Sequence, residues 1–307
     1  MIFLFFIRPQ RESCNPNVMP QKVNLKTIAK DLNLSPSTIS RVLNNKAKEF
    51  RISTETVSLI QKYVENKGYS PNMIARGLQA SRTMTLGLII PDISNPFFSL
   101  MARFIENAAS KSDYSIILGD SEEDVTKELR QIKNMISRKV DGIIAAPVGT
   151  TFDQFSEITK REIPLLFFYI YSDSIKIPYI TSDNFQGGYM ATTLLIKNGH
   201  RNIALIKGDE KIEPVKERKA GYFRALRDAS IKASDSFIQG NSFSIENGYT
   251  CSMRLLNGKN KPTAIFAMSN LIGLGVLEAV KELKMRIPND LSLVVFDDQS
   301  YVSYLNP

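Results

Sequence analysis

The feature that most constrains the fold is an alternation of short apolar segments and amphipathic segments that begins at Thr85. The apolar segments predict strands at 86–91, 115–120, 142–147, 164–169, 179–183, 203–208, 264–269 and 291–297. The segments between them predict helices at 97–111, 122–138, 185–198, 217–229, 245–257 and 271–284. Continuously apolar strands separated by helices are typical of parallel sheets covered on both faces. The sequence therefore predicts an α/β body.

Polar residues directly after these predicted strands are the first candidates for a binding site. Ligands of open parallel sheets bind beyond the carboxyl ends of the strands. The segments at those positions are "PDISNPFF", "APVGTT", "SDN", "KGDE", "MSN" and "FDDQ". We expect a small-molecule site to be built from some of them.

The chain carries few of the residues that enzymes and metal sites require. It has two cysteines and one histidine, too few for a metal cluster, a disulfide framework or a histidine-based triad. No strand leads into a G-x-G-x-x-G or Walker A motif, so no cofactor is expected. Four aspartates could be imagined as catalytic carboxylates, but neither a nucleophile nor a base accompanies them: Asp92, Asp183, Asp297 and Asp298. We expect no catalytic residue, no metal and no enzyme activity.

The segment before the body predicts three short helices. Asn24 precedes a helical apolar pattern as a candidate N-cap, and Asn33 follows at the turn. Ser35 then caps a second helix with Pro36 in its first position. A third helix is expected from Ser53 as cap to Gly68 as stop. The three-residue connection between the first two helices is the length that a helix-turn-helix needs.

Most of the net positive charge of the chain comes from this small segment and the residues up to 82. Residues 22–82 contain eleven Lys or Arg and four Asp or Glu, which gives +7 of the total formal charge of +8. On the second helix, the side opposite the apolar stripe carries Ser37, Thr38 and Arg41. In a helix-turn-helix these positions face base edges, and Arg suits guanine. The alternative is a plain three-helix packing unit with a solvated basic face.

The motifs resemble one family along nearly the whole chain. "TIAKDLNLSPSTISRVLNNK" and "RISTETVSLIQKYVENKGYSPNMIARGL" are similar to the DNA-binding headpiece and hinge of the lactose/purine repressor (LacI) family. The similarity continues in order through "TLGLIIPDISNPFF", "VDGIIAAP", "SDNFQGGYMAT", "NGHRNIALI", "ERKAGYFRAL", "PTAIFAMSN" and "PNDLSLVVFDD". The resemblance implies an all-α helix-turn-helix headpiece with a hinge helix. A periplasmic-binding-protein-like α/β body of two parallel-sheet subdomains would follow.

The resemblance implies a set of DNA-contacting residues: Thr27, Pro36, Ser37, Thr38, Ser40, Arg41, Asn44, Asn72, Arg76 and Leu78. Two hinge segments, one from each subunit, would fold against each other on the operator, and Leu78 would wedge into the minor groove. The alternative for Leu78 is that it covers the core of the body.

It also implies a set of effector-contacting residues: Asp92, Asn95, Phe97, Phe98, Arg218, Phe243, Asn270 and Asp297. An aromatic face with a few polar side chains suits a sugar-like ring. Core packing is the alternative for each aromatic residue. Tyr169 and Ile170 stand where many sugar-responsive members have an Asp-Arg pair, and Leu271 stands where many have Asp, so a polyol ligand is in doubt.

The expected organisation is a disordered or mis-started tail (1–21), a headpiece (22–70), a hinge (71–83), and subdomains at 84–182 and 183–307. The family continues beyond the position of Pro307, so we expect the second subdomain to be incomplete.

The expected function is that of a cytoplasmic, homodimeric repressor that binds a near-palindromic double-stranded operator under the control of a small, sugar-like effector. Partnership with a membrane is not expected. A small-ligand-binding protein of the periplasmic type and a truncated regulator with impaired effector response remain alternatives.

Overall fold

A computed structural model describes residues 24–69, 82–171 and 176–298. The chain divides into two compact units, with the division between Gln79 and Ala80. The expected tail (1–21) and nearly all of the expected hinge (71–83) lie outside the described residues.

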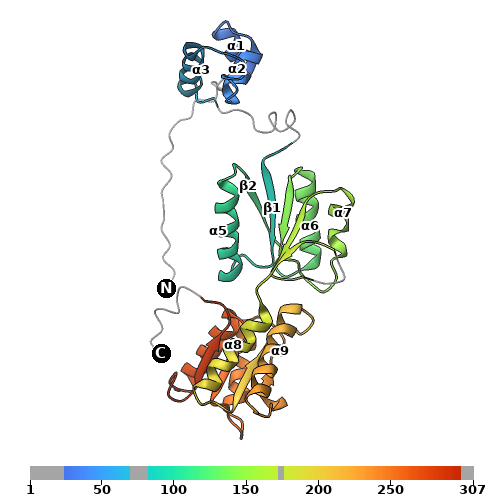
Figure 1. Ribbon diagram of the computed structural model, residues 1–307, viewed down its shortest axis with the longest axis vertical. Coiled ribbons are helices and arrows are strands. Elements are labelled where there is room, and N and C mark those ends of the chain that lie inside the picture. Colours follow the sequence, from blue (N-terminus) through green and yellow to red (C-terminus); the bar gives the residue numbers. More distant parts are fainter. Residues whose placement is uncertain (1–23, 70–81, 172–175, 299–307) are drawn as a thin grey trace, which may run out of the picture. The chain divides into compact units, whose positions relative to one another are not determined.

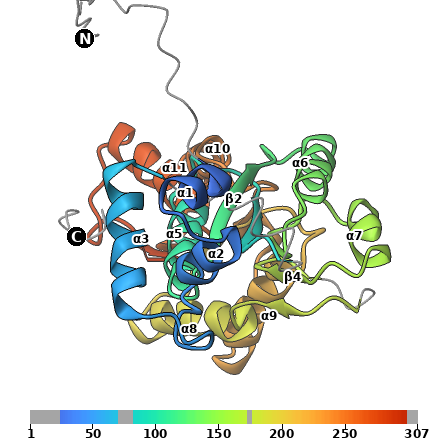
Figure 2. The ribbon, with the colours of Figure 1, turned by 90° about the horizontal axis from the view of Figure 1, so that it is seen from above.

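The first unit contains three helices, α1 (Leu25–Asp31), α2 (Pro36–Leu43) and α3 (Thr54–Asn66) (Figures 1 and 2). Each begins after a side chain that accepts a backbone N–H of the first turn. The caps are Asn24, Ser35 and Ser53, at 3.0, 3.1 and 3.2 Å from the nitrogen atoms that they accept. The turn between α1 and α2 contains Asn33 at φ 51°, a conformation that Asn adopts more readily than most residues. The predicted helix-turn-helix is confirmed.

One small apolar core holds these helices together. Its buried members are Ile28 and Ala29 from α1, Ile39 and Val42 from α2, and Ile60 from α3. Because Ile39 and Val42 occupy one face of α2, the side chains on its other face do not contribute to the core.

The second unit contains two parallel sheets, as predicted. The first sheet has the order β2-β1-β3-β4-β5 and the second has the order β7-β6-β8-β9. In the first sheet the strands are β1 (Thr85–Ile90), β2 (Ser115–Asp120), β3 (Gly142–Ala145), β4 (Leu165–Phe168) and β5 (Tyr179–Ile180). In the second they are β6 (Ile203–Ile206), β7 (Ile238–Gln239), β8 (Ala264–Ala267) and β9 (Ser292–Val295).

Helices cover both faces of the first sheet (Figure 1). One face carries α5 (Pro96–Ser110), and the other carries α6 (Val125–Ser137), the 3-10 helix Asp153–Phe155 and α7 (Ser156–Lys160). The alternation of β1 side chains serves both layers. Leu88 and Ile90 pack with Phe98 of α5, whereas Ile89 packs with residues of α6.

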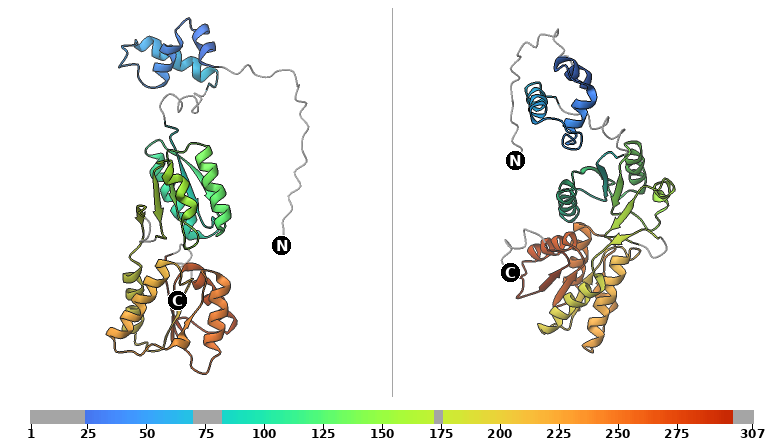
Figure 3. Two further views of the ribbon diagram at one scale, coloured as in Figure 1. Left: turned by 90° about the vertical axis from the view of Figure 1, so that its right-hand side faces the viewer. Right: turned by 45° about the horizontal axis from the view of Figure 1, so that its top comes forward.

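The second sheet is covered in the same way (Figure 3). α8 (Asn184–Lys197) and α9 (Glu213–Asp228) lie on one face, and α10 (Ile245–Leu256) and α11 (Asn270–Glu282) lie on the other. A short 3-10 helix, Asp235–Phe237, precedes β7. Two consecutive side chains at the end of β9 point to opposite faces of the sheet. Val295 packs against α11 on one face, and Phe296 packs against α8 on the other.

Glycines allow the two helix pairs to pack closely. A Cβ atom on Gly221 of α9 would lie under 3.0 Å from the backbone of α8. A Cβ atom on Gly275 of α11 would lie equally close to the backbone of α10. Side chains at these positions would separate helices that together cover a face of the sheet.

Some elements differ from the sequence-based expectation. The helix predicted from residue 217 begins at Glu213, because Pro214 fits the first turn of a helix, where its missing N–H costs nothing. Strand β7 and helix α7 were not predicted. β7 has two residues and α7 has five, which is too short to show a period.

We expect Gly275→Ala to lower the free energy of unfolding by ~1–3 kcal/mol, as overpacking does. The loss should exceed the gain of up to about 1 kcal/mol that alanine brings to a helix. Urea unfolding of the intact chain, followed by circular dichroism, measures the change. Gly258→Ala is the matched control, because its Cβ would meet its neighbours at ordinary distances of 3.4 Å or more. Equal stability of both variants would contradict the close packing of α10 on α11.

Candidate functional site

The described residues of the predicted DNA-contacting set gather on α1 and α2. Pro36, Ser37 and Arg41 are exposed. Four others are partly exposed: Thr27, Thr38, Ser40 and Asn44. The remaining three, Asn72, Arg76 and Leu78, lie outside the described residues.

Hydroxyl groups cluster at the beginning of α2. The Oγ atom of Ser35 lies 2.7 Å from Ser37 Oγ and 2.8 Å from Thr38 Oγ1, and it also accepts the backbone N–H of Thr38. The cap therefore orients the two hydroxyls that follow it. Hydroxyls held at a helix N-terminus are suited to phosphate oxygens or base edges.

Arg41 is the basic side chain in the last turn of α2, and an aromatic ring orients it. Its guanidinium carbon lies 3.9 Å from the centre of the Phe50 ring. Phe50 belongs to the connection between α2 and α3 and is itself 41% exposed. A planar guanidinium stacked on a ring keeps its edge N–H groups available, and these are the groups that pair with guanine.

The positive charges of this unit are not neutralised internally. Seven lysine and arginine side chains besides Arg41 are exposed: Lys26, Lys30, Lys46, Lys48, Arg51, Lys62 and Lys67. Within residues 24–69, none of them forms an ion pair with a carboxylate. Free cations on a small unit attract a polyanion over several ångströms and can contact its phosphates directly.

A second candidate site is a cavity of about 380 Å³ in the body, at the carboxyl ends of strands from both sheets. Six of the eight residues predicted to contact an effector line it: Asn95, Phe97, Phe98, Phe243, Asn270 and Asp297. A hydrogen bond links the two sheet-centred lobes at this cavity, where Asn270 Nδ2 donates to Asn95 Oδ1 at 3.2 Å.

Three aromatic rings form one wall of the cavity. Phe97 lies 5.1 Å from Phe98 and 5.3 Å from Tyr169, and Phe98 lies 5.4 Å from Tyr169, as distances between ring centres. Phe98 is only 5% exposed and also belongs to the core between β1 and α5, so core packing accounts for much of its contact. Phe97 and Tyr169 present more of their surface to the cavity side of this cluster.

The other two predicted residues, Arg218 and Asp92, are not part of this lining. Arg218 lines an adjoining cavity of about 580 Å³, which shares Phe97, Tyr169 and Asp297 with the first. Arg218 is 2% exposed. Its Nε donates to Asn184 Oδ1 at 2.9 Å, and its Nη1 donates to the carbonyl of Met268. The guanidinium carbon also lies 3.5 Å from the centre of the Phe296 ring. Arg218 thus ties α8 to the end of β8 at the adjoining cavity.

Asp92 stabilises a turn. Its Oδ1 accepts the backbone N–H of Ser94 at 2.7 Å and the hydroxyl of Ser94 at 2.6 Å. Asn95 then caps α5 by accepting the N–H of Phe97. The turn at Asp92 therefore positions Asn95, the N-cap of α5, and the first turn of that helix. Both Asn95 and Phe97 then line the cavity.

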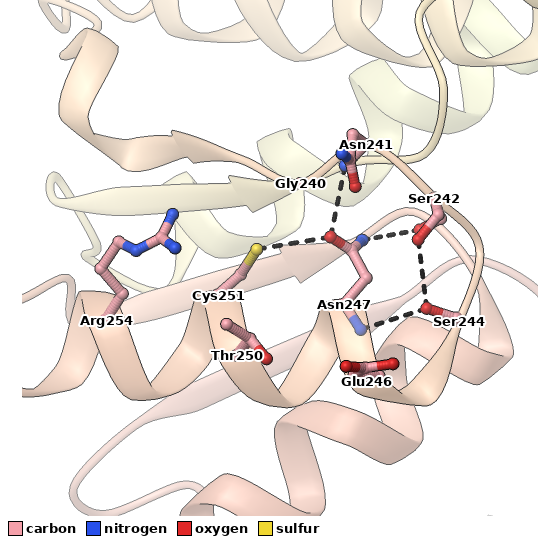
Figure 4. A pocket seen from close by; sticks show the side chains of 9 residues that line it. All are labelled: Gly240, Asn241, Ser242, Ser244, Glu246, Asn247, Thr250, Cys251 and Arg254. Atoms are coloured by element: carbon pink, nitrogen blue, oxygen red, sulfur yellow. Dashed lines mark hydrogen bonds between the residues drawn. The ribbon is translucent and has the colours of Figure 1, made fainter.

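Another part of the lining is the loop 240–243, which Asn247 of α10 holds in place. Figure 4 shows these hydrogen bonds at a second pocket, which shares Asn241 and Ser242 with the cavity. Asn247 Nδ2 donates to the carbonyls of Ser242 at 2.6 Å and Lys207 at 3.1 Å, and its Oδ1 accepts the N–H of Asn241 at 3.3 Å. The ring of Phe243 packs directly against Gly208, because a Cβ atom on Gly208 would lie only 2.7 Å from that ring. One amide side chain thus fixes the segment that brings Ser242 and Phe243 to the cavity.

A buried glutamate holds another wall. Glu128 of α6 accepts the N–H of Val148 at 3.0 Å and a proton of Gln154 Nε2 at 2.6 Å. Val148 belongs to the loop 147–150, which lines the cavity. Burial raises the pKa of Glu128 to about 7, although both hydrogen bonds oppose the shift. This carboxyl group therefore changes charge near neutral pH.

Sequence reasoning missed several of these residues. Asp209, after β6, was within a segment that had been singled out, but it had no assigned role. Glu123, Asn241 and Ser242 also line the cavity and were not predicted. The position of Glu123 after an expected strand could have suggested it. The loop 240–243 follows β7, whose two residues gave no strand signal.

The described part of the chain offers little to metals or membranes. It contains no group of three or more His, Cys, Asp or Glu side chains that could hold a metal ion. Among the same residues, no helix combines the length and the apolar character that crossing a bilayer requires.

Two family models match the chain. Residues 24–72 match "Bacterial regulatory proteins, lacI family", and residues 83–304 match "Periplasmic binding proteins and sugar binding domain of LacI family". Among similar proteins, catabolite control protein A of Priestia megaterium is 34% identical over 93% of this chain and 85% of its own length. The HTH-type transcriptional regulator DegA of Bacillus subtilis is 32% identical over 90% of this chain and 82% of its own length.

Solved structures show the same architecture. A putative ribose operon repressor from Burkholderia thailandensis is 28% identical, with a TM-score of 0.67 over 73% of this chain and 83% of that chain. The Lac repressor dimer bound to operator and the anti-inducer ONPF is 23% identical, with a TM-score of 0.80 over 92% of this chain and 84% of that chain. The second likeness concerns the fold alone.

We expect the buried Glu128 to make stability depend on pH. Its pKa is higher in the folded protein, at about 7, than the ordinary value of 4.5. The folded state therefore holds its proton more tightly, and stability should fall as pH rises from about 4.5 through 7. Glu128→Gln should lose this decline in urea unfolding series between pH 5 and 8, whereas Glu106→Gln, at an exposed position of α5, should keep it. Parallel pH profiles for wild type and Glu128→Gln would contradict the assignment.

Proposed function

Because the chain belongs to the LacI family of bacterial regulatory proteins, it is a DNA-binding transcriptional regulator and not an enzyme, and we propose that it acts as a repressor. In this proposal residues 22–70 read the operator and residues 71–83 form the hinge. The subdomains 84–182 and 183–307 bind the effector between them. The protein would work in the cytoplasm, where bacterial DNA is accessible to it.

The observation that carries the DNA-reading part is the exposed face of α2. Ser37 and Arg41 are free of the apolar core, and Phe50 orients the Arg41 guanidinium. The exposed lysines and arginines of the same unit, without internal ion pairs, would supply phosphate contacts. We propose the described members of the predicted set, from Thr27 to Asn44, as the contact surface, with Asn72, Arg76 and Leu78 acting from the hinge.

A homodimer would explain apolar side chains that the body leaves exposed. Leu100 and Phe104 of α5 are 39% and 58% exposed, and Leu118 of β2 is 39% exposed. The two elements are in contact, so these side chains belong to one region of the surface. Exposed apolar groups of this kind are typical of subunit interfaces. A twofold dimer with two headpieces would favour a near-palindromic operator.

The cavity in the body would bind the effector, a small molecule about the size of a sugar ring. Its lining comes from both lobes, so a ligand there would favour one arrangement of the lobes over another. A ligand shifts a conformational equilibrium only by its difference in affinity for the two states. We propose that this difference reaches the DNA through the hinge. Asp92 would act indirectly, by fixing a wall of the cavity, and Arg218 would act from the adjoining cavity.

The DNA-reading surface can be tested with purified full-length protein. Selection from random duplexes should enrich a near-palindromic site, and affinity for that site should fall steeply with salt because phosphate contacts release counterions. Arg41→Ala should relax base preference at one position of each half-site by ~1–3 kcal/mol. Fluorescence anisotropy with single-base variants of the site measures this.

Lys62→Ala, at an exposed position of α3, is the control for this experiment. It should weaken all duplexes equally or leave them unchanged. Binding that is insensitive to salt, or an Arg41→Ala protein with unchanged base preference, would contradict the proposed reading surface.

The stacking of Arg41 on Phe50 gives a separate prediction. Phe50→Ala should reduce the base preference due to Arg41 by ~0.5–1 kcal/mol, the size of an exposed cation–π contact. Phe50→Tyr should preserve the preference, because the ring face remains. In the Arg41→Ala background, Phe50→Ala should have no further effect on base preference. A full effect in that background would show that Phe50 acts independently of Arg41.

A further inference from the structure

Three neutral side chains of the effector cavity, Asn95, Ser269 and Ser242, use their oxygen atoms in hydrogen bonds within the protein. Asn95 Oδ1 accepts both the N–H of Phe97 and the amide of Asn270. Ser269 Oγ accepts the N–H of Ile272 as the cap of α11, and Ser242 Oγ lies 3.1 Å from Ser244 Oγ. A ligand with many hydroxyl groups would have to compete with these internal hydrogen bonds.

The charged groups of the cavity are all acidic. Glu123, Asp209 and Asp297 line it, and among the described residues no lysine, arginine or histidine does. Arg218 lines the adjoining cavity, which also contains Asp297, and it donates to Asn184 and Met268. Even with Arg218 counted against the three carboxylates, the site has an excess of two negative charges. Such a site repels anions and favours a cation.

These carboxylates have few partners of their own. No described side chain donates a hydrogen bond to the carboxylate of Glu123 or Asp297, and neither forms an ion pair in that part of the chain. Asp209 accepts only the N–H of Lys211 there, at 2.9 Å. Burial raises the pKa of Asp297, although the nearby positive charge of Arg218 opposes the shift. A bound cation would stabilise the carboxylate of Asp297.

The aromatic walls are suited to the same kind of ligand. Phe97 and Tyr169, which are in contact in the first lobe, and Phe243 of the second lobe line the cavity together with the three acids. Ring faces attract cations, and the attraction is stronger in a site shielded from water. Aromatic faces also pack against an apolar or sugar ring. The volume of about 380 Å³ is near the lower end for ligand sites, which limits the ligand to a compact one.

We infer that the effector is a compact ring that carries a protonated amine, and not a neutral or phosphorylated sugar. This inference rests on the proposed function of the cavity as the effector site. The ring would lie between the Phe97–Tyr169 wall and Phe243. The ammonium group would be directed to Asp297, with Glu123 and Asp209 providing a negative field at the cavity.

Matched probes separate charge from shape. The first series is glucosamine, glucose and glucose 6-phosphate, and the second is benzylamine, benzyl alcohol and benzoate. Isothermal titration of full-length protein at millimolar probe concentrations should show a preference of roughly tenfold or more for the amine over its neutral partner. The anions should not bind. The series in which the amine binds more tightly identifies whether the ring is sugar-like or aromatic.

Variants test which groups provide the preference. Asp297→Asn should remove most of the amine preference while neutral probes bind as before, and Glu123→Gln should have a smaller effect in the same direction. Asp298→Asn is the matched control, since it lies next to Asp297 in sequence but does not line the cavity. It should leave both affinities unchanged.

The outcomes distinguish this inference from the proposed function. Neutral or anionic probes that bind as tightly as the amines, with Asp297→Asn indistinguishable from wild type, would overturn the charge class while the cavity remained the effector site. If neither glucosamine nor benzylamine bound, the inference of a protonated amine would also be overturned. Failure to bind any selected duplex would instead count against the regulatory function.

Discussion

Burial of parallel strands on both faces is the constraint on which the body depends. Residues inside the strands are used for core packing, as in β6 and β8, where every residue is buried. Polar side chains can then gather only where the strands end. The ends of several strands bring Asn95, Asn270 and Asp297 to one cavity, although they are far apart in the sequence. The chemistry of the cavity is thus a consequence of sheet topology, and the loops determine which ligand it accepts.

The side chains next to the cavity act on it through geometry. Arg218 directs its Nε and Nη1 to Asn184 and Met268, which fixes its guanidinium at the adjoining cavity. Asn247 and Glu128 likewise use their hydrogen bonds to hold loops, one at Ser242 and one at Val148. Buried polar groups are costly unless they are satisfied, and the satisfied ones here fix the walls of the cavity. Asn247 and Glu128 would thus affect affinity without contacting the effector.

The sequence predicted the fold class, the three helices of the headpiece with their caps, and the longer strands, because each leaves a local periodic or capping signal. It also placed six of the eight effector candidates at the cavity. It did not show that Arg218 would be tied to Asn184 and Met268 at an adjoining cavity, because helical position alone does not reveal such partners. The stacking of Phe50 on Arg41 escaped it as well, since the contact joins a helix to an irregular connection. The net charge of the cavity is the sum over residues from segments of both lobes, so no local sequence pattern predicts it.

The distribution of charge separates the two binding functions. Residues 22–82 carry +7 of the net charge of +8, whereas the cavity is lined by Glu123, Asp209 and Asp297. DNA phosphates are repelled from the cavity, and a cationic effector is repelled from the headpiece. Direct competition of the two ligands for one surface is thereby disfavoured on electrostatic grounds. Any influence of the effector on DNA binding must then pass through a change in the state of the body, so the coupling between the two sites is reciprocal.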